Sequence, residues 1–310
     1  MYKSPLSSLI ANQQVTLEAD EVIGKILHKS GPLPQVKLAF EPVLKLLWIT
    51  IKPEPKPVFT LQLLTSVGKV QRAVFDLWGR DSRAESPVKF LAYRGEGPVF
   101  TLGGDLDFYL DCLASNDRNA LDEYARTSVE GASWNASGLK GLAITLSTIH
   151  AKAIGGGIDA PRSCNLMIAE EGASFVYPEV RFNHFPIAAV TILSRRMGPI
   201  EAQRMLMSGD EYTATEFYSR GGVDAVVSPG GGEDWIRGYA AETLPMHAAR
   251  SALFAAFHQR AGRIEDELEY AAKLWSETML RLSPAEISKL QRIAQAQERM
   301  LSRMYRASDA

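Results

Sequence analysis

The feature that most constrains the fold is an alternation of short apolar segments with longer helical ones across residues 88–227. Short segments at residues 88–93, 99–102, 150–154, 166–169 and 173–176 have the length of strands. Residues 117–129 and 139–149 have the apolar spacing of helices. Alternation of this kind favours an α/β fold whose strands are buried.

Other segments flank this core. Residues 36–40 and 44–51, separated by Glu41-Pro42, predict a hairpin, and residues 61–78 predict a helix. Glycine and proline at residues 30–34 end an N-terminal arm, and residues 233–304 are almost wholly helical in pattern. We therefore expect an arm over residues 1–35, a core over residues 36–230 and a helical C-terminal subdomain over residues 231–310.

The composition excludes several classes of protein. Of the 310 residues 46% are apolar and 23% are charged, and the formal charge of −2 attracts neither nucleic acid nor an anionic membrane. No run approaches about 20 apolar residues, and the N-terminus lacks a signal-peptide pattern, so a cytoplasmic protein is expected. Cys112 and Cys164 are expected to serve in packing, and the five histidines have no metal-binding spacing.

Two glycine-bearing loops each follow a predicted strand. They are Gly103-Gly104 and Gly155-Gly156-Gly157. Glycine lets the backbone approach a ligand closely, and two amides aimed at one point form an oxyanion hole. Each loop alone is equally well explained as a plain turn. Neither G-x-G-x-x-G nor G-x-x-x-x-G-K-[ST] occurs, so these two modes of nucleotide binding are unsupported.

Two carboxylates stand at informative positions after the second loop. Asp159 lies two residues beyond the triple glycine, in the first turn of a predicted helix, and Glu179 follows 20 residues later. An acid at a helix N-terminus also complements the helix dipole, and Pro178-Glu179 can be a solvated turn. If both loops and both carboxylates share one site, the carboxyl groups can act as acid and base.

The motifs together resemble the enoyl-CoA hydratase/isomerase (crotonase) superfamily. The segment Phe100-x-x-Gly103-Gly104-Asp105-Leu106 is similar to F-x-x-G-[AG]-D-[LI], and residues 153–159 are similar to the end of G-x-x-x-G-G-G-x-[ED], although His150 or Ala151 replaces the leading glycine. Pro178-Glu179 and the segment at residues 222–227 match in order. The resemblance implies a crotonase-like spiral of ββα units with a helical C-terminal subdomain that covers the pocket and forms a homotrimer or hexamer.

Several stretches resemble the diffusible-signal-factor synthases within that superfamily. They are residues 102–106, 168–172, 178–186 and 272–279. The resemblance implies dehydration of a 3-hydroxyacyl thioester to a cis-2-enoyl product with thioester hydrolysis, which makes a fatty-acid quorum-sensing signal. Two departures are Asp159, where the subfamily has glutamate, and residues 187–190, which replace a glycine-containing stretch. The shorter aspartate side chain withdraws the carboxyl group by about 1.5 Å. A displacement of a catalytic group by about 1 Å can lower the rate on the order of 100-fold.

The resemblance also suggests roles for individual residues. The amides of Gly104 and Gly156 would hold an enolate oxygen, and Asp159 and Glu179 would act as acid and base, with Glu179 indispensable. The aromatic residues near the motifs are Phe108, Tyr109, Trp134, Phe182 and Phe185, and the resemblance adds Trp275, with core packing as the alternative for each. Of these, Phe108, Trp134, Phe182 and Trp275 are the predicted substrate-binding residues. His184 is interpreted as a structural or rim residue.

The expected partner is an acyl thioester of coenzyme A or acyl carrier protein, with no separate cofactor. Two other functions stay open. One is an ordinary enoyl-CoA hydratase or isomerase of fatty-acid metabolism. The other is a catalytically weak acyl-binding homologue, for which the shortened side chain of Asp159 is the main support.

Overall fold

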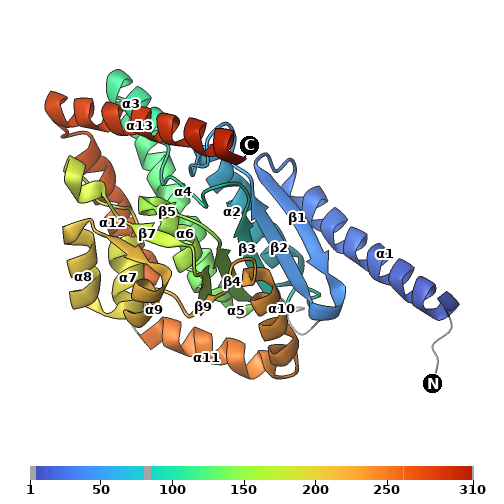
Figure 1. The fold of residues 1–310 in the computed structure, drawn as a ribbon. Coiled ribbons are helices and arrows are strands. Elements are labelled where there is room, and N and C mark those ends of the chain that lie inside the picture. Colours follow the sequence, from blue (N-terminus) through green and yellow to red (C-terminus); the bar gives the residue numbers. More distant parts are fainter. Residues whose placement is uncertain (1–4, 80–84, 261, 309–310) are drawn as a thin grey trace.

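The computed structural model describes residues 5–79, 85–260 and 262–308, and a six-stranded sheet lies at its centre (Figure 1). The strand order is β1-β2-β3-β4-β6-β9, in which β1 and β2 are antiparallel and the other neighbours are parallel. A smaller sheet has the order β5-β7-β8. The strands are β1 Val36–Glu41, β2 Leu46–Ile51, β3 Phe90–Gly95, β4 Ile144–Ile149, β5 Ala153–Ile154, β6 Leu166–Glu170, β7 Ser174–Val176, β8 Glu211–Thr213 and β9 Ala225–Val227.

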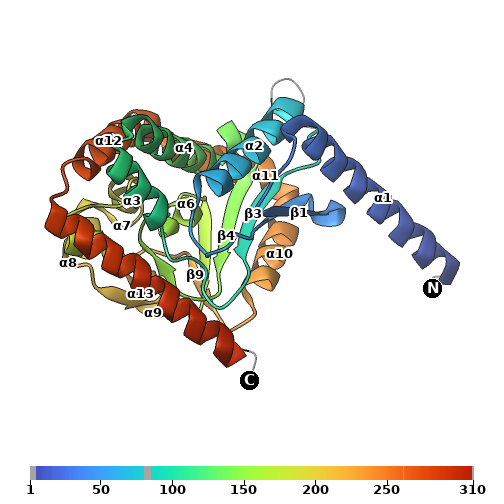
Figure 2. The same ribbon diagram turned by 90° about the horizontal axis from the view of Figure 1, so that it is seen from above.

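Helices cover both faces of the large sheet (Figure 2). On one face, α2 (Leu61–Trp78) packs against β2 and β3, and α1 (Pro5–Ser30) packs against β1 and α2. On the other face, α10 (Gly232–Thr243) packs through Ile236 and Ala240. Every residue of β2 and β4 is buried. The buried, mostly parallel strands confirm the predicted α/β fold.

The predicted hairpin and the predicted helix over residues 61–78 are confirmed, but the helix over residues 139–149 is wrong. Residues 138–141 form the short helix α5 (Gly138–Gly141), and the chain then enters strand β4. A strand that is buried on both faces carries an uninterrupted apolar run, which periodicity does not distinguish from a buried helix. The predicted strand over residues 150–154 is also shorter, since β5 has two residues.

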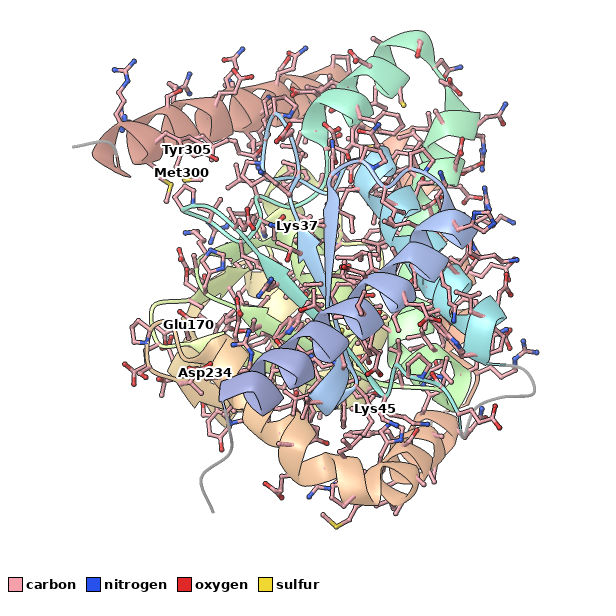
Figure 3. The ribbon with its side chains drawn as sticks, turned by 90° about the vertical axis from the view of Figure 1, so that its right-hand side faces the viewer. Lys37, Lys45, Glu170, Asp234, Met300 and Tyr305 are labelled. Carbon is pink, nitrogen blue, oxygen red and sulfur yellow. The ribbon has the colours of Figure 1, made fainter. Side chains whose placement is uncertain are left out.

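The described part of the N-terminal arm is the helix α1. It ends at Ser30, before Gly31, whose φ of +71° suits glycine and fits the predicted break. Val22 and Ile26 of this helix are buried against β1, β2 and α2. Figure 3 shows α1 lying across the hairpin that carries Lys37 and Lys45.

The C-terminal residues are helical, as their pattern predicts. Helix α12 (Ile264–Met279) packs along α4 (Arg118–Ala136), and α13 (Pro284–Ser308) crosses α3 (Leu106–Ser115) (Figure 1). Met300 and Tyr305 lie on the side of α13 that faces the body of the molecule (Figure 3). The other helices are α6 Asp159–Arg162, α7 Ala189–Met197, α8 Pro199–Ser208, α9 Ala214–Ser219 and α11 His247–Arg260.

Candidate active site

The structure brings the two glycine loops into contact. Thr101 pairs with Ala153 in an isolated bridge, which joins the segments that lead into the loops. Gly103 has a φ of +100°, a conformation that side chains disfavour. A Cβ atom on Gly157 would lie only 3.0 Å from the Cα atom of Gly103, so the approach of the two loops requires a glycine at position 157.

Asp159 lies where the second loop becomes a helix. Gly155–Ile158 form a 3-10 turn, and Asp159 begins α6. Its side chain is buried; Oδ1 accepts a hydrogen bond from the Tyr177 hydroxyl at 3.0 Å and Oδ2 accepts one from the Ala188 amide at 2.9 Å. Burial raises the pKa of Asp159 from 3.8 to about 7, although both hydrogen bonds oppose the shift.

Glu179 lies close to Asp159 and begins a 3-10 turn after β7, Glu179–Phe182. Its Oε1 accepts a hydrogen bond from the Gly156 amide at 2.8 Å, while Oε2 is buried and has no hydrogen-bond partner among the described residues. Burial, assisted by the charge of Asp159, raises the pKa of Glu179 from 4.5 to about 8. The two carboxyl groups are therefore both held toward the neutral form.

The contact between Gly156 and Glu179 indicates what the second loop can bind. The Glu179 oxygen at this amide stands in for the oxygen of an enolate, because both accept a hydrogen bond from the same N–H group. The predicted convergence of the Gly104 and Gly156 amides on one substrate oxygen stays a prediction, since Glu179 occupies the Gly156 amide here. A Cβ atom on Gly155 would lie 2.2 Å from Glu179 Oε1, so only glycine leaves room for this carboxyl.

A single cavity is lined by both glycine loops and both carboxyl groups. Gly104, Gly156, Asp159 and Glu179 all line it. Its remaining wall is largely aromatic and aliphatic and comes from several elements, including Phe59, Tyr109, Tyr124, Phe182, Phe185, Ile187, Trp275 and Ile293. Trp275 belongs to α12 and Ile293 to α13, so the C-terminal helices close the cavity on one side. Such a cavity suits a ligand with an acyl chain.

The structure places two of the four predicted substrate-binding residues in this wall and two elsewhere. Phe182 and Trp275 line the cavity, whereas Phe108 and Trp134 do not. Trp134 is half-buried and packs on Phe75 at a ring-centroid distance of 5.2 Å, at the edge of the core beneath α2. Phe108 stacks on Tyr124 at 5.5 Å and lies behind the wall. Closeness to a motif in sequence does not give the direction of a side chain on its helix.

Tyr109, one of the aromatic residues near the motifs in sequence, lines the cavity. The Tyr109 hydroxyl lies against the first loop, because a Cβ atom on Gly104 would be 2.0 Å from it. Leu106, Tyr109 and Cys112 are the buried positions of α3, and this i, i+3 spacing is a signal that favours Tyr109 over Phe108 as the inward residue. No side-chain pattern reveals the Ala188 amide as a partner of Asp159.

Two features are absent from the part of the chain that the structure describes. The described residues contain no group of three or more histidine, cysteine, aspartate or glutamate side chains placed to hold a metal ion. Among their helices none combines the length and apolar character needed to span a bilayer. Cys112 and Cys164 are both buried and unpaired, which confirms their predicted role in packing.

Solved structures share this fold at low sequence identity. An enoyl-CoA hydratase/isomerase from Xanthobacter autotrophicus superposes with a TM-score of 0.70 at 18% identity, covering 87% of this chain and 96% of that one. An enoyl-CoA hydratase from Bacillus halodurans gives 0.68 at 20% identity, covering 83% and 98%. The architecture is thus the mixed α/β crotonase fold with C-terminal helices.

Sequence comparison gives the family directly. Residues 93–279, more than half of the chain, match the enoyl-CoA hydratase/isomerase family, and the chain belongs to that family. A mevalonyl-coenzyme A hydratase of Beauveria bassiana is 28% identical over 156 residues, which are 48% of this chain and 54% of that protein. A probable enoyl-CoA hydratase of Bacillus subtilis is 25% identical over 193 residues, 62% and 69% respectively.

Proposed function

We propose that the protein adds water reversibly across the C2–C3 double bond of an enoyl thioester. The observation that carries this proposal is the shared cavity of Asp159, Glu179, Gly104 and Gly156, with both carboxyl pKa values raised toward neutrality. A hydratase needs one carboxyl ionised and the other protonated at the same pH. Environments that separate the two pKa values provide that pair of states.

The hydrogen bonds of the two carboxyl groups assign the roles. Asp159 accepts hydrogen bonds from the Tyr177 hydroxyl and the Ala188 amide, which favour its ionised form, whereas Oε2 of Glu179 has no partner among the described residues, which favours its protonated form. Asp159 takes a proton from water as the oxygen adds to C3, and Glu179 delivers its proton to C2. The backbone amides hold the enolate oxygen in between. In dehydration the same two proton transfers run in reverse, and water leaves.

The hydratases among the sequence relatives support this proposal. Two of these relatives are named as hydratases of coenzyme A thioesters, which favours an ordinary enoyl-CoA hydratase among the functions expected from the sequence. The narrower proposal, a signal synthase that also hydrolyses the thioester to release a cis-2-enoic acid, rests on the sequence resemblance alone. The same is true of acyl carrier protein as the carrier.

Product analysis tests the proposal. Purified protein is given trans-2-enoyl-CoA and, separately, 3-hydroxyacyl thioesters of coenzyme A and of acyl carrier protein, and mass spectrometry identifies the products. Reversible hydration without loss of the thioester supports the proposal, and release of a free cis-2-enoic acid supports the signal synthase instead. Binding of every thioester without turnover would contradict both and leave the acyl-binding homologue.

One substitution tests the assigned acid. Glu179→Gln removes the transferable proton but keeps the shape of the side chain, so hydration should slow by about 100- to 10,000-fold. The kcat of purified variant and wild type is compared, with Glu269→Gln on the exposed face of α12 as the control for a neutralised carboxylate. A Glu179→Gln protein that keeps more than a tenth of wild-type kcat would remove Glu179 from the mechanism.

A further inference from the structure

One side chain in the cavity wall has a chemistry that the hydration of a plain acyl chain does not use. His184 is 6% exposed and lines the cavity, yet neither of its ring nitrogens has a hydrogen-bond partner among the described residues. A buried polar group without a partner costs about 1–3 kcal/mol. His184 therefore carries two unused hydrogen-bonding positions in a wall that is otherwise mainly apolar.

Its neighbours fix where this ring lies. The ring packs against Trp275 at a centroid distance of 5.1 Å and against Phe185 at 5.4 Å. The backbone amide of His184 donates to the Glu179 carbonyl at 3.1 Å, just after Asn183, whose φ is +59°. His184 is thus anchored by the turn that carries Glu179, while its ring lies among the aromatic residues that close the acyl side of the cavity.

The imidazole is neutral and makes no hydrogen bond to the catalytic carboxyl groups, because neither ring nitrogen has a partner among the described residues. Burial lowers the pKa of His184 to about 3. The oxygens of Asp159 are instead engaged by the Tyr177 hydroxyl and the Ala188 amide. The hydroxyl that forms at C3 lies between the carboxyl groups in the proposed reaction, so it is not the group that His184 would meet.

A neutral imidazole has one N–H donor and one nitrogen acceptor. A hydroxyl group also donates one hydrogen bond and accepts others, whereas a methylene does neither and a carboxylate only accepts. Resting on the proposed hydratase function, we infer that His184 forms a subsite for a hydroxyl group carried on the acyl chain beyond C3. The substrate class is then an acyl thioester with a hydroxylated chain.

Paired substrates of equal length test this inference. One member of each pair carries a hydroxyl group beyond C3, moved one carbon at a time along the series, and the other carries a methylene there. The wild-type protein should favour the hydroxylated member at one position by about 10- to 100-fold in kcat/KM, because its partner leaves His184 unsatisfied. His184→Leu should abolish that preference while retaining turnover of the unsubstituted thioester.

Two more variants keep the result interpretable. His184→Gln restores one donor and one acceptor and should recover part of the preference. His28→Leu, on the exposed part of α1, is the matched control and should keep the wild-type ratio. If His184→Leu does not fold by circular dichroism, the Gln variant and the wild-type substrate series decide the matter.

The outcomes separate this inference from the proposed function. Equal kcat/KM for both members of every pair, or an unchanged preference in His184→Leu, overturns the hydroxyl subsite and leaves the hydratase intact. If no thioester is turned over, the hydratase fails, and titration calorimetry with the same pairs then measures the subsite. In that experiment a hydroxyl preference that depends on His184 supports the subsite, and its absence overturns it.

Discussion

The acid/base pair determines how the rate depends on pH. The proposed hydration requires Asp159 ionised and Glu179 protonated, so kcat should fall below pH about 7, where Asp159 gains a proton, and above pH about 8, where Glu179 loses one. Tyr177→Phe removes a hydrogen bond that favours the ionised form of Asp159, and the acidic limb should move upward by about one pH unit.

Initial rates of hydration across pH 5–10 measure both limbs. Tyr218→Phe, at an exposed tyrosine of α9, controls for the loss of a phenol hydroxyl. A Tyr177→Phe profile that superposes on the wild-type one would show that Asp159 does not set the acidic limb.

Gly155 provides a second test at the scale of one residue. Its φ is +56°, and a Cβ atom would lie 2.2 Å from Glu179 Oε1. Gly155→Ala should therefore lower kcat by at least about 100-fold by displacing this carboxyl. Gly31→Ala is the control, because Gly31 has a φ of +71° and nothing lies within 4 Å of the new atom.

The pair of glycine variants separates a displaced carboxyl from backbone strain. Both variants should lose about 1–3 kcal/mol of unfolding free energy because of backbone strain. Only Gly155→Ala should also lose kcat far beyond what its loss of stability explains. Equal kcat values for the two folded variants, measured beside their urea unfolding curves, would contradict the packing described for Glu179.

Among the elements, α1 illustrates how a helix outside the family match is held. Ile26 is fully buried against the sheet, whereas its neighbour Leu27 is 44% exposed. Ile26→Ala should cost about 2–5 kcal/mol of unfolding free energy, and Leu27→Ala less than about 0.5 kcal/mol. Urea denaturation measures both, and similar losses for the two variants would show that α1 does not pack as described.

The sequence predicts elements best where one face of the element is polar. Residues 61–78 alternate apolar and polar positions at helical spacing and form α2 as predicted. Strand β4 is buried at all six positions, and its apolar run was mistaken for a helix. Tertiary packing decides whether such a segment forms a strand or a helix, and the local sequence does not contain that information.

The same limit applies to the candidate site. Motif spacing predicts that Gly104, Gly156, Asp159 and Glu179 meet, because strand ends and helix starts fix their backbones. It does not predict side-chain direction, so Trp134 lies at the edge of the core under α2 and His184, interpreted as a structural or rim residue, lies in the cavity wall. The Ala188 amide that holds Asp159 has no sequence signal at all.

At the scale of the whole molecule, the two buried carboxyl groups tie stability to pH. Their folded pKa values, about 7 and about 8, exceed the ordinary values of 3.8 and 4.5. Between pH 4 and 8 the unfolded chain therefore binds fewer protons than the folded one, and the unfolding free energy contributed by these groups falls as pH rises. Each pKa unit corresponds to about 1.4 kcal/mol.

Thermal unfolding between pH 5 and 9 measures this contribution. Tm should decline across that range in the wild type, and Asp159→Asn combined with Glu179→Gln should flatten the decline. Glu269→Gln should leave the slope unchanged. A wild-type Tm that rises from pH 5 to pH 9 would contradict burial as the cause of both shifts.

The trimer or hexamer expected from the family resemblance stays a prediction. Because association of subunits makes Tm depend on concentration, each variant should be compared at one protein concentration.

The hydrogen bond from the Gly156 amide to Glu179 has a consequence for the order of events in a turnover. In the proposed mechanism an arriving thioester carbonyl takes the place of Glu179 Oε1, so binding of the substrate also releases the proton donor from the Gly156 amide. Without a carbonyl in position the donor stays tethered to the backbone. Substrate binding and release of the proton donor are then one step. A ligand that fills the apolar cavity but lacks the carbonyl oxygen would leave Glu179 bound to the Gly156 amide and unable to deliver its proton.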